Sequence, residues 1–177
     1  MGNLIVDFEG SGKQRERSFV EPDVYIASIV GVSDIYVSTN PFNNEEEGKM
    51  TITFEVMPDL SVAKFVQLPY FIRAKIVHSG KKQGYSDSKL YTLLLKAGLL
   101  EECKTFFDGI KDDADNEKKV VDWLKEKLMG KSVKVMAKTI QPKDGGSVYS
   151  TVSEVIKFVD IPLNPANTET IVEESVE

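Results

Sequence analysis

The sequence alternates apolar and polar side chains without interruption in one stretch, Met50-Thr51-Ile52-Thr53-Phe54-Glu55-Val56-Met57. Side chains of a β-strand point alternately to opposite faces, so a period of two predicts a strand with one buried face. Its isoleucine, phenylalanine and valine would then line a hydrophobic core, and its threonines and glutamate would face solvent. Pro58-Asp59 ends the strand. The fold is therefore expected to be built around a β-sheet.

Two further extended segments flank this strand in the sequence. Residues 24–38 are rich in valine, isoleucine and tyrosine, which favours one long strand with a bend at Gly31. Residues 65–77 form a third extended stretch, interrupted at Pro69. In that stretch, alternation places Ile72, Ala74 and Ile76 on one face, and on the other face Phe71, Arg73 and Lys75.

The spacing of apolar residues becomes helical after these strands. Asp87 or Ser88 is the expected N-cap of a helix that Gly98 ends. Residues 99–107 predict a second short helix, and residues 117–129 predict a third, whose apolar stripe includes the only tryptophan. Alternation returns at residues 132–140 and 148–158, which are joined by the turn sequence Pro142-Lys143-Asp144-Gly145-Gly146.

The elements thus run in the order of three strands, a helical segment and a two-stranded hairpin. A five-stranded barrel with a helix between its third and fourth strands is the OB-fold. We therefore expect a mainly β protein, with a five-stranded OB-fold barrel over residues 22–160 and a helical insertion between strands 3 and 4. A small β-sandwich with a helical insertion fits the same order and is the alternative.

Both ends of the chain differ in composition from its middle. Residues 1–21 contain Lys13, Arg15 and Arg17 among glycines and predict a flexible basic arm. Residues 161–177 contain no lysine or arginine and predict an acidic disordered tail, whose glutamates are Glu169, Glu173, Glu174 and Glu177. The formal net charge of -6 taken alone disfavours phosphate binding. Because the acidic residues occur in blocks, this number says little about any one face.

The single cysteine, Cys103, excludes an intramolecular disulfide and fits a reducing compartment. It lies in a helical apolar pattern, so we expect it to be buried. No stretch approaches the about 20 apolar residues of a membrane span. Residues 1–6 also lack the features of a signal peptide. These features predict a cytoplasmic protein without a membrane partner.

Residues capable of catalysis do not form a recognisable constellation. Gly10-Ser11-Gly12-Lys13 resembles the end of a phosphate-binding loop, but Asp7 stands where the first glycine belongs and Gln14 where serine or threonine belongs. His78 is the only histidine and is expected to be a surface or contact group. The acidic cluster at residues 112–115 lacks the glycine and spaced glutamate of a calcium loop. We expect no enzyme activity, cofactor or metal.

Basic and aromatic side chains recur on three segments of the predicted barrel. Proteins hold single strands through cations that contact phosphates and aromatic rings that stack on bases. This pattern predicts nucleic-acid binding by Phe71, Arg73, Lys75, Lys81, Lys82, Lys131, Lys134, Lys138 and Tyr149. We expect one connected face to carry Arg73, Lys75, Lys134 and Lys138, with Phe71 or Tyr149 exposed among them. The alternative for each lysine is that it only solvates the sheet or blocks edge aggregation.

Four short segments carry a family resemblance: Pro22 to Ala27, Leu93 to Leu99, Leu128 to Val135 and Tyr149 to Val152. Together they resemble the OB-fold single-stranded DNA-binding proteins of bacteriophages and related viruses. In that group a Pro-x-x-Tyr segment starts the first strand, and a Leu-x-x-Gly helix end lies mid-chain. A Leu-x-Gly-Lys-x-Val-x-Val segment opens the fourth strand, and a hairpin bearing a tyrosine ends the barrel.

The resemblance covers residues 22–158 and implies a protein that coats single-stranded DNA in replication or recombination, encoded by a virus or a mobile element. It also implies that the tail glutamates Glu169, Glu173, Glu174 and Glu177 recruit replication or recombination proteins. The tail departs from the family pattern because it ends Glu174-Ser175-Val176-Glu177, without a terminal aromatic residue. This departure puts recruitment through the tail in question.

Stacking and phosphate contacts carry little sequence information, so we expect binding that tolerates any sequence. DNA is the expected strand and RNA the alternative, and a homo-oligomer is compatible with the sequence. A different class of function is a structural or assembly protein that uses the barrel as a protein–protein interaction module. An enzyme accessory domain and a barrel that binds saccharide or peptide are further alternatives.

Overall fold

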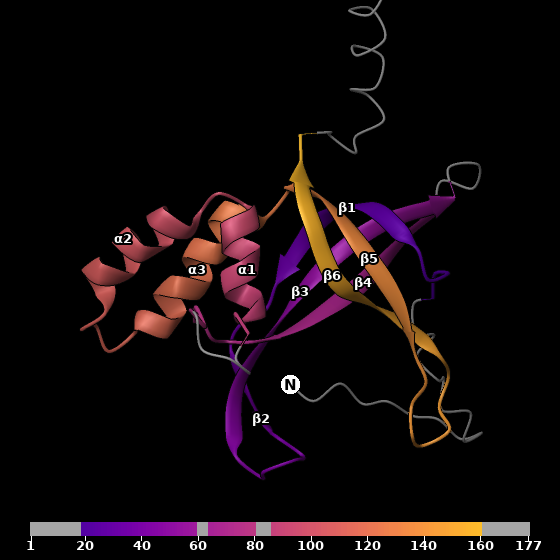
Figure 1. The fold of residues 1–177 in the computed structure, drawn as a ribbon, viewed down its shortest axis with the longest axis horizontal. Coiled ribbons are helices and arrows are strands. Elements are labelled where there is room, and N and C mark those ends of the chain that lie inside the picture. The colour runs from indigo at the N-terminus through magenta and orange to yellow at the C-terminus, as the bar shows by residue number, and fades with distance from the viewer. Residues whose placement is uncertain (1–18, 60–63, 81–85, 161–177) are drawn as a thin grey trace, which may run out of the picture.

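A mostly antiparallel sheet and three helices make up residues 19–59, 64–80 and 86–160, which this computed structural model describes (Figure 1). The strands are β1 (Val24–Val32), β2 (Tyr36–Thr39), β3 (Glu46–Asp59), β4 (Lys64–Arg73), β5 (Ser132–Ile140) and β6 (Tyr149–Val159). The helices are α1 (Lys89–Lys96), α2 (Leu100–Ile110) and α3 (Asn116–Leu128). All three helices lie between β4 and β5, where the helical insertion was predicted. The fold is therefore mixed α/β, not mainly β.

Strand β3 contains the alternating stretch and holds the sheet together. Its inward side chains, Met50, Ile52, Phe54 and Val56, are all buried, as their spacing predicts. One edge of β3 pairs with β2 and then with β1, and the other edge pairs with β4. The outward residues Thr51 and Thr53 keep partial contact with solvent.

The single strand expected over residues 24–38 is divided into β1 and β2, so the sheet has six strands instead of five. Strands β1 and β2 both pair with the same edge of β3. The register of the pairing between β1 and β3 shifts between Ile29 and Gly31. A Cβ atom at Gly31 would lie 3.3 Å from the Cβ atom of Thr53, so this close approach favours glycine. The predicted bend is thus a β-bulge, followed by a break in pairing.

The predicted barrel closure is not observed as a hydrogen-bonded ladder. The sheet order is β2-β3-β1-β5-β6, with β4 attached to β3, so β4 and β6 end the paired path. In the described ranges these two strands touch without pairing. Helix α1 contacts both of them. The Nζ atom of Lys96 donates to the carbonyl oxygen of Val155 on β6 at 2.6 Å, and Lys89 lies 5.2 Å from the ring centroid of Tyr70 on β4.

Helices and sheet share one hydrophobic core, to which α1 contributes Leu93 and Leu94, and α3 contributes Leu124. Of the two N-cap candidates for α1, Ser88 is the cap: its Oγ atom accepts a hydrogen bond from the Tyr91 amide at 3.3 Å. Helix α2 continues to Ile110, three residues beyond its predicted end.

Trp123 and Cys103 are buried, as predicted. The Trp123 ring stacks on Phe106 of α2 with a centroid distance of 5.6 Å. Burial raises the pKa of the Cys103 thiol, which disfavours the reactive thiolate form. The role of this cysteine is therefore packing.

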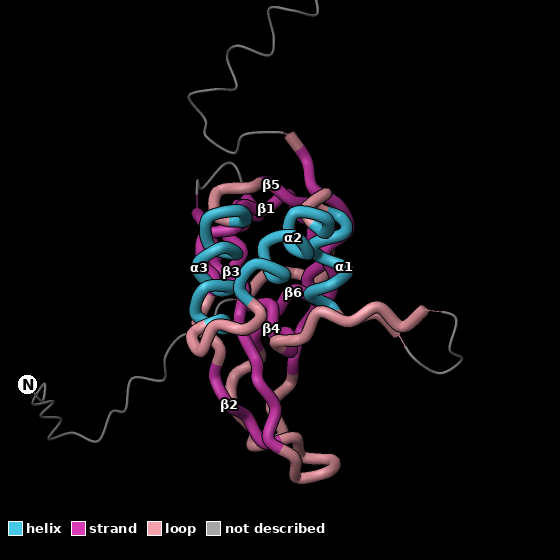
Figure 2. Tube along the Cα trace, turned by 90° about the vertical axis from the view of Figure 1, so that its left-hand side faces the viewer, coloured by secondary structure: helices cyan, strands magenta, loops and turns pink. Residues whose placement is uncertain are grey.

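Two hairpins project from the same end of the sheet, away from the helices (Figures 1 and 2). One joins β2 to β3 through residues 40–45, and the other joins β5 to β6 through residues 141–148. The helices lie together on one side of the sheet (Figure 2). None of the helices in the described ranges is long and apolar enough to cross a membrane.

Replacing Lys96 with methionine should lower the free energy of unfolding by about 1–3 kcal/mol, because the Val155 carbonyl loses a charged donor. Methionine retains much of the apolar stem, so the packing of α1 is largely kept. Urea unfolding measures the difference. Lys118→Met, at an exposed lysine of α3, is the matched control and should change the free energy by less than about 0.5 kcal/mol. Equal effects of the two substitutions would contradict a bridging role for Lys96.

Candidate nucleic-acid interface

Three neighbouring strands bring aromatic and basic side chains together on the outer face of the sheet. Lys49 of β3 lies opposite Tyr36 of β2 on one side and opposite Arg73 of β4 on the other. Thr51 lies opposite Phe71. Cross-strand partners project from the same face, so one surface, here called the outer row, carries Tyr36, Lys49, Thr51, Phe71 and Arg73. The core lies on the opposite face.

The rings of the outer row are accessible to a ligand. Phe71 is 47% exposed and Tyr36 is 39% exposed. The hydroxyl groups of Tyr36 and Thr51 form a hydrogen bond of 3.3 Å, which restrains the Tyr36 ring above β3. Both rings can therefore offer a face to a nucleobase without unfolding of the sheet.

Arg73 forms an ion pair with Glu47, with 3.2 Å between Nε and Oε2. The Arg73 side chain is exposed, whereas the Glu47 side chain is only 18% exposed and also accepts a hydrogen bond from Asn40. The guanidinium group is therefore the part of this ion pair that a phosphate can reach.

A groove of about 660 Å³ continues the outer row toward the N-terminus of α1. The residues that line this basic groove include Phe71, Asp87 and the basic residues Lys49, Arg73, Lys75 and Lys89. Burial and the nearby charge of Lys138 lower the pKa of Lys89. Lys138 of β5 is thus near enough to Lys89 to repel its charge, but it is not among the residues that line the groove.

Asp87 stabilises the segment between β4 and α1, at the edge of the groove, by accepting hydrogen bonds from it. Its Oδ1 atom accepts hydrogen bonds from the Ser79 amide at 2.8 Å, the Ser79 hydroxyl at 2.9 Å and Nδ1 of His78 at 2.8 Å. The Ser79 amide is the largest cause that lowers the pKa of Asp87. The His78 ring stacks on Tyr91 of α1, with centroids 5.1 Å apart. His78 is thus a surface group that lines the groove and positions α1.

The structure brings together Phe71, Arg73 and Lys75 of the predicted residues, whereas Lys138 does not line the groove and affects only the charge of Lys89. It does not bring Lys134 to the same place. Lys134 lies opposite Ile26 and Lys157 and is four residues from Lys138, about 13 Å along a strand.

Lys131 precedes β5 at the same distant end, where its carbonyl oxygen accepts a hydrogen bond from Ile29. Tyr149 begins β6 opposite Ile140, on the second projecting hairpin. Lys81, Lys82 and the tail glutamates Glu169, Glu173, Glu174 and Glu177 lie outside the described residues, as does the basic arm up to residue 18.

Tyr36, Lys49 and Lys89 belong to the site but were not among the predicted residues. Lys49 continues the polar side of the alternating stretch, with Thr51 and Thr53, so its outward direction is visible in the sequence. Tyr36 joins the row through the pairing of β2 with β3. Lys89 reaches the groove because α1 packs against β4, a contact that no local pattern encodes.

The predicted absence of a metal site remains an expectation. Across the described ranges, no three His, Cys, Asp or Glu side chains gather as a metal ion would require. In the acidic loop, Asp113 and Asp115 both contact Lys119, at 2.7 and 3.3 Å.

No protein-family model, no curated protein and no solved structure matches this chain.

Replacing Asp87 with asparagine should flatten the loss of stability in acid. Because the folded state lowers the pKa of Asp87, its carboxylate stabilises the fold above the ordinary carboxyl range, and this contribution disappears as the pH falls through the lowered value. Unfolding free energies measured from about pH 5 to about pH 2 should therefore fall more steeply for the wild type than for Asp87→Asn. Asp122→Asn, at an exposed position of α3, should keep the wild-type steepness. Parallel curves for all three proteins would refute the assignment.

Proposed function

We propose that this chain binds single-stranded nucleic acid, with DNA as the expected strand, through the outer row and the basic groove. The observation that carries the proposal is the juxtaposition of the exposed Phe71 and Tyr36 rings with Lys49 and Arg73. A single strand exposes both the faces of its bases and its phosphates, whereas a duplex hides the base faces. Rings and cations on one surface therefore favour a single strand.

The finer fold that we propose is an OB-fold. The paired order β4-β3-β1-β5-β6, together with the contact between β4 and β6, follows the circular strand order of a small barrel. In this interpretation β2 extends the first strand, and α1 covers the seam at which the ladder is open. OB-folds bind oligonucleotides on their second and third strands and the adjoining loops. The equivalent parts here are β3, β4 and the two projecting hairpins.

The proposed binding is tolerant of base sequence, because ring stacking and phosphate contacts do not distinguish one base from another. A role in replication or recombination, a viral or mobile-element origin and recruitment of partner proteins by the tail are proposals that rest on the family resemblance. No catalytic step is part of the proposed function.

Removing either ring of the outer row should weaken binding of a short single-stranded oligonucleotide by about 1–3 kcal/mol, which is roughly 5- to 150-fold. The variants are Phe71→Ala and Tyr36→Ala, and the measurement is fluorescence anisotropy with a labelled oligonucleotide and a duplex of the same sequence. Leu95→Ala, at an exposed apolar residue of α1, is the control and should bind as the wild type does. Equal binding of strand and duplex by the wild type, or wild-type affinity in both ring variants, would overturn the proposal.

Neutralising the groove lysines should reduce the dependence of affinity on salt. Each lost phosphate contact to a single strand should reduce the slope of log K against log salt concentration by about 0.7. Lys49→Gln and Lys89→Gln are the test variants, and Lys118→Gln on α3 is the matched control. An assembly protein without a nucleic-acid ligand would show no salt-dependent binding at all.

A further inference from the structure

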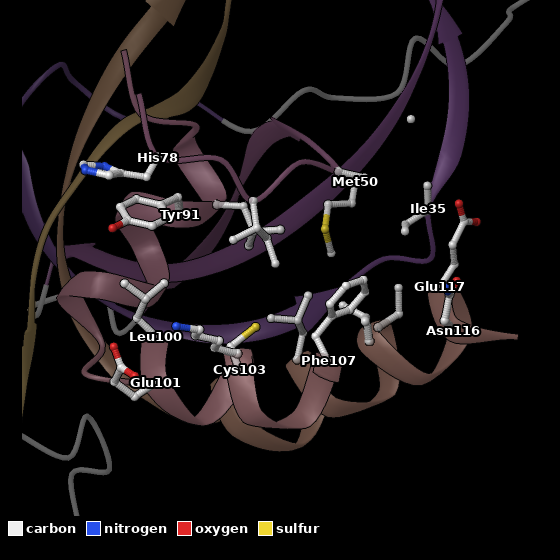
Figure 3. A pocket seen from close by; sticks show the side chains of 18 residues that line it. Ile35, Met50, His78, Tyr91, Leu100, Glu101, Cys103, Phe107, Asn116 and Glu117 are labelled. Atoms are coloured by element: carbon white, nitrogen blue, oxygen red, sulfur yellow. The ribbon is translucent and has the colours of Figure 1, made fainter. Parts of the chain in front are cut away.

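A pair of stacked rings lies where the basic groove reaches α1. The imidazole ring of His78 stacks on the ring of Tyr91, with centroids 5.1 Å apart and ring planes inclined by 19°. Both residues also border a second cavity, of about 730 Å³, between the helices and the ends of β3 and β4 (Figure 3). The His78 ring points away from the centre of that cavity (Figure 3). Its outward side therefore belongs to the basic groove, whose lining includes His78.

Hydrogen bonds hold the His78 ring and its neighbours in place. Nδ1 of His78 donates to the Asp87 carboxylate at 2.8 Å, which fixes the rotation of the ring. The Ser79 amide donates to the same carboxylate at 2.8 Å. On the other side of His78, the Val77 amide donates to Oγ of Ser88 at 3.0 Å, and the Ser88 amide donates to the Val77 carbonyl at 3.0 Å. A ring held in this way loses little conformational entropy when a ligand binds to it.

One face of the imidazole ring is covered and the other is accessible. Tyr91 covers the first face, yet 59% of the His78 side chain is exposed. No second ring in the described ranges stacks on His78. The other parallel stack of the described chain, Phe106 on Trp123, has nearly the same inclination of 18°, but its Trp123 ring is buried in the core. The stack at His78 thus differs from a core packing pair in offering an aromatic face to solvent.

The surroundings of this face fit a nucleobase that is joined to phosphates. Lys75 and Lys89 line the same groove as His78 and supply cations for the phosphates. The carboxylate of Asp87 is close to the ring, but its Oδ1 atom already accepts three hydrogen bonds, which offset its negative charge. A strand that continues from the Phe71 ring along the groove therefore meets cations and a further aromatic face, the two features that hold a single strand.

We propose that the outward face of His78 is a stacking platform for one nucleobase of a bound single strand. The platform extends the binding site from the outer row, through the basic groove, to the N-terminal end of α1. This inference rests on the proposed function and adds a residue and a mode of contact to it. Every base has an aromatic face, so the platform accepts any of them, whereas a duplex hides these faces.

Affinity for a labelled single-stranded oligonucleotide, measured by fluorescence anisotropy, tests the platform. His78→Ala removes the ring and should weaken binding about 5- to 150-fold, the range expected for the loss of one stacked base. His78→Phe keeps an aromatic face at the same position and should recover most of that loss, although it lacks the hydrogen bond to Asp87. Leu95→Ala, at an exposed residue of α1 outside the groove lining, should bind as the wild type does.

The emission of 2-aminopurine, an adenine analogue that is quenched when it stacks, gives a second measurement that does not depend on affinity. The probes are oligonucleotides of the shortest length that binds with full affinity, each with the analogue at a single position. When all oligonucleotide is bound, at least one position should emit more strongly with His78→Ala than with the wild type or His78→Phe. Phe71→Ala should affect a different position, because Phe71 is on β4 and His78 follows that strand.

Thermal melts followed by circular dichroism establish that each variant is folded before it is compared. Wild-type affinity in His78→Ala, equal weakening by the alanine and phenylalanine variants, or unchanged emission at every position would each overturn the platform. In those cases, weaker binding by Tyr36→Ala and Phe71→Ala would still support the proposed function. A wild type that binds no single strand would instead overturn the proposed function and the platform together.

Discussion

The register of β3 is the constraint on which the other features depend, because this strand is paired along both edges. Side chains alternate across a strand, so a shift of one residue would move Phe54 from the core to solvent and Lys49 from solvent to the core. The fully buried Phe54 makes that shift costly. The same register sets Lys49 between Tyr36 and Arg73. Core packing and the candidate interface are therefore fixed together.

Local pattern was sufficient to predict the three helices and most of the strands, but not the division of residues 24–38 into two strands or the way in which the sheet ends. The alternation of residues 50–57, the Ser88 cap and the hairpin at residues 141–148 are set by neighbours in sequence, and they were predicted correctly. The break between β1 and β2 and the open seam between β4 and β6 arise from contacts between distant residues. The Lys96 to Val155 hydrogen bond joins residues 59 positions apart, and no periodicity encodes such a contact.

The same difference between local pattern and distant contacts explains which residues of the candidate site could be predicted. Alternation assigns a face to each strand residue, so Phe71 and Arg73 could be placed outward and together from their spacing alone. It does not assign a position along or around the sheet, so Lys134 shares the outward direction with Lys138 but lies four residues away. The position of Lys89 at the groove depends on how α1 packs against β4, so strand patterns could not predict it. Sequence reasoning therefore recovers the outward direction of side chains more reliably than their proximity.

A chain with a formal net charge of -6 can attract a polyanion when its charges are segregated. The cations of the basic groove come from β3, β4 and the segments around α1, whereas acidic blocks lie in the hairpin tip and between α2 and α3. Asp113 and Asp115 are in addition compensated by Lys119. Physiological salt screens exposed charges beyond about 8 Å. A phosphate in the groove therefore experiences mainly the local lysines and Arg73, and the total charge of the chain has little influence on it.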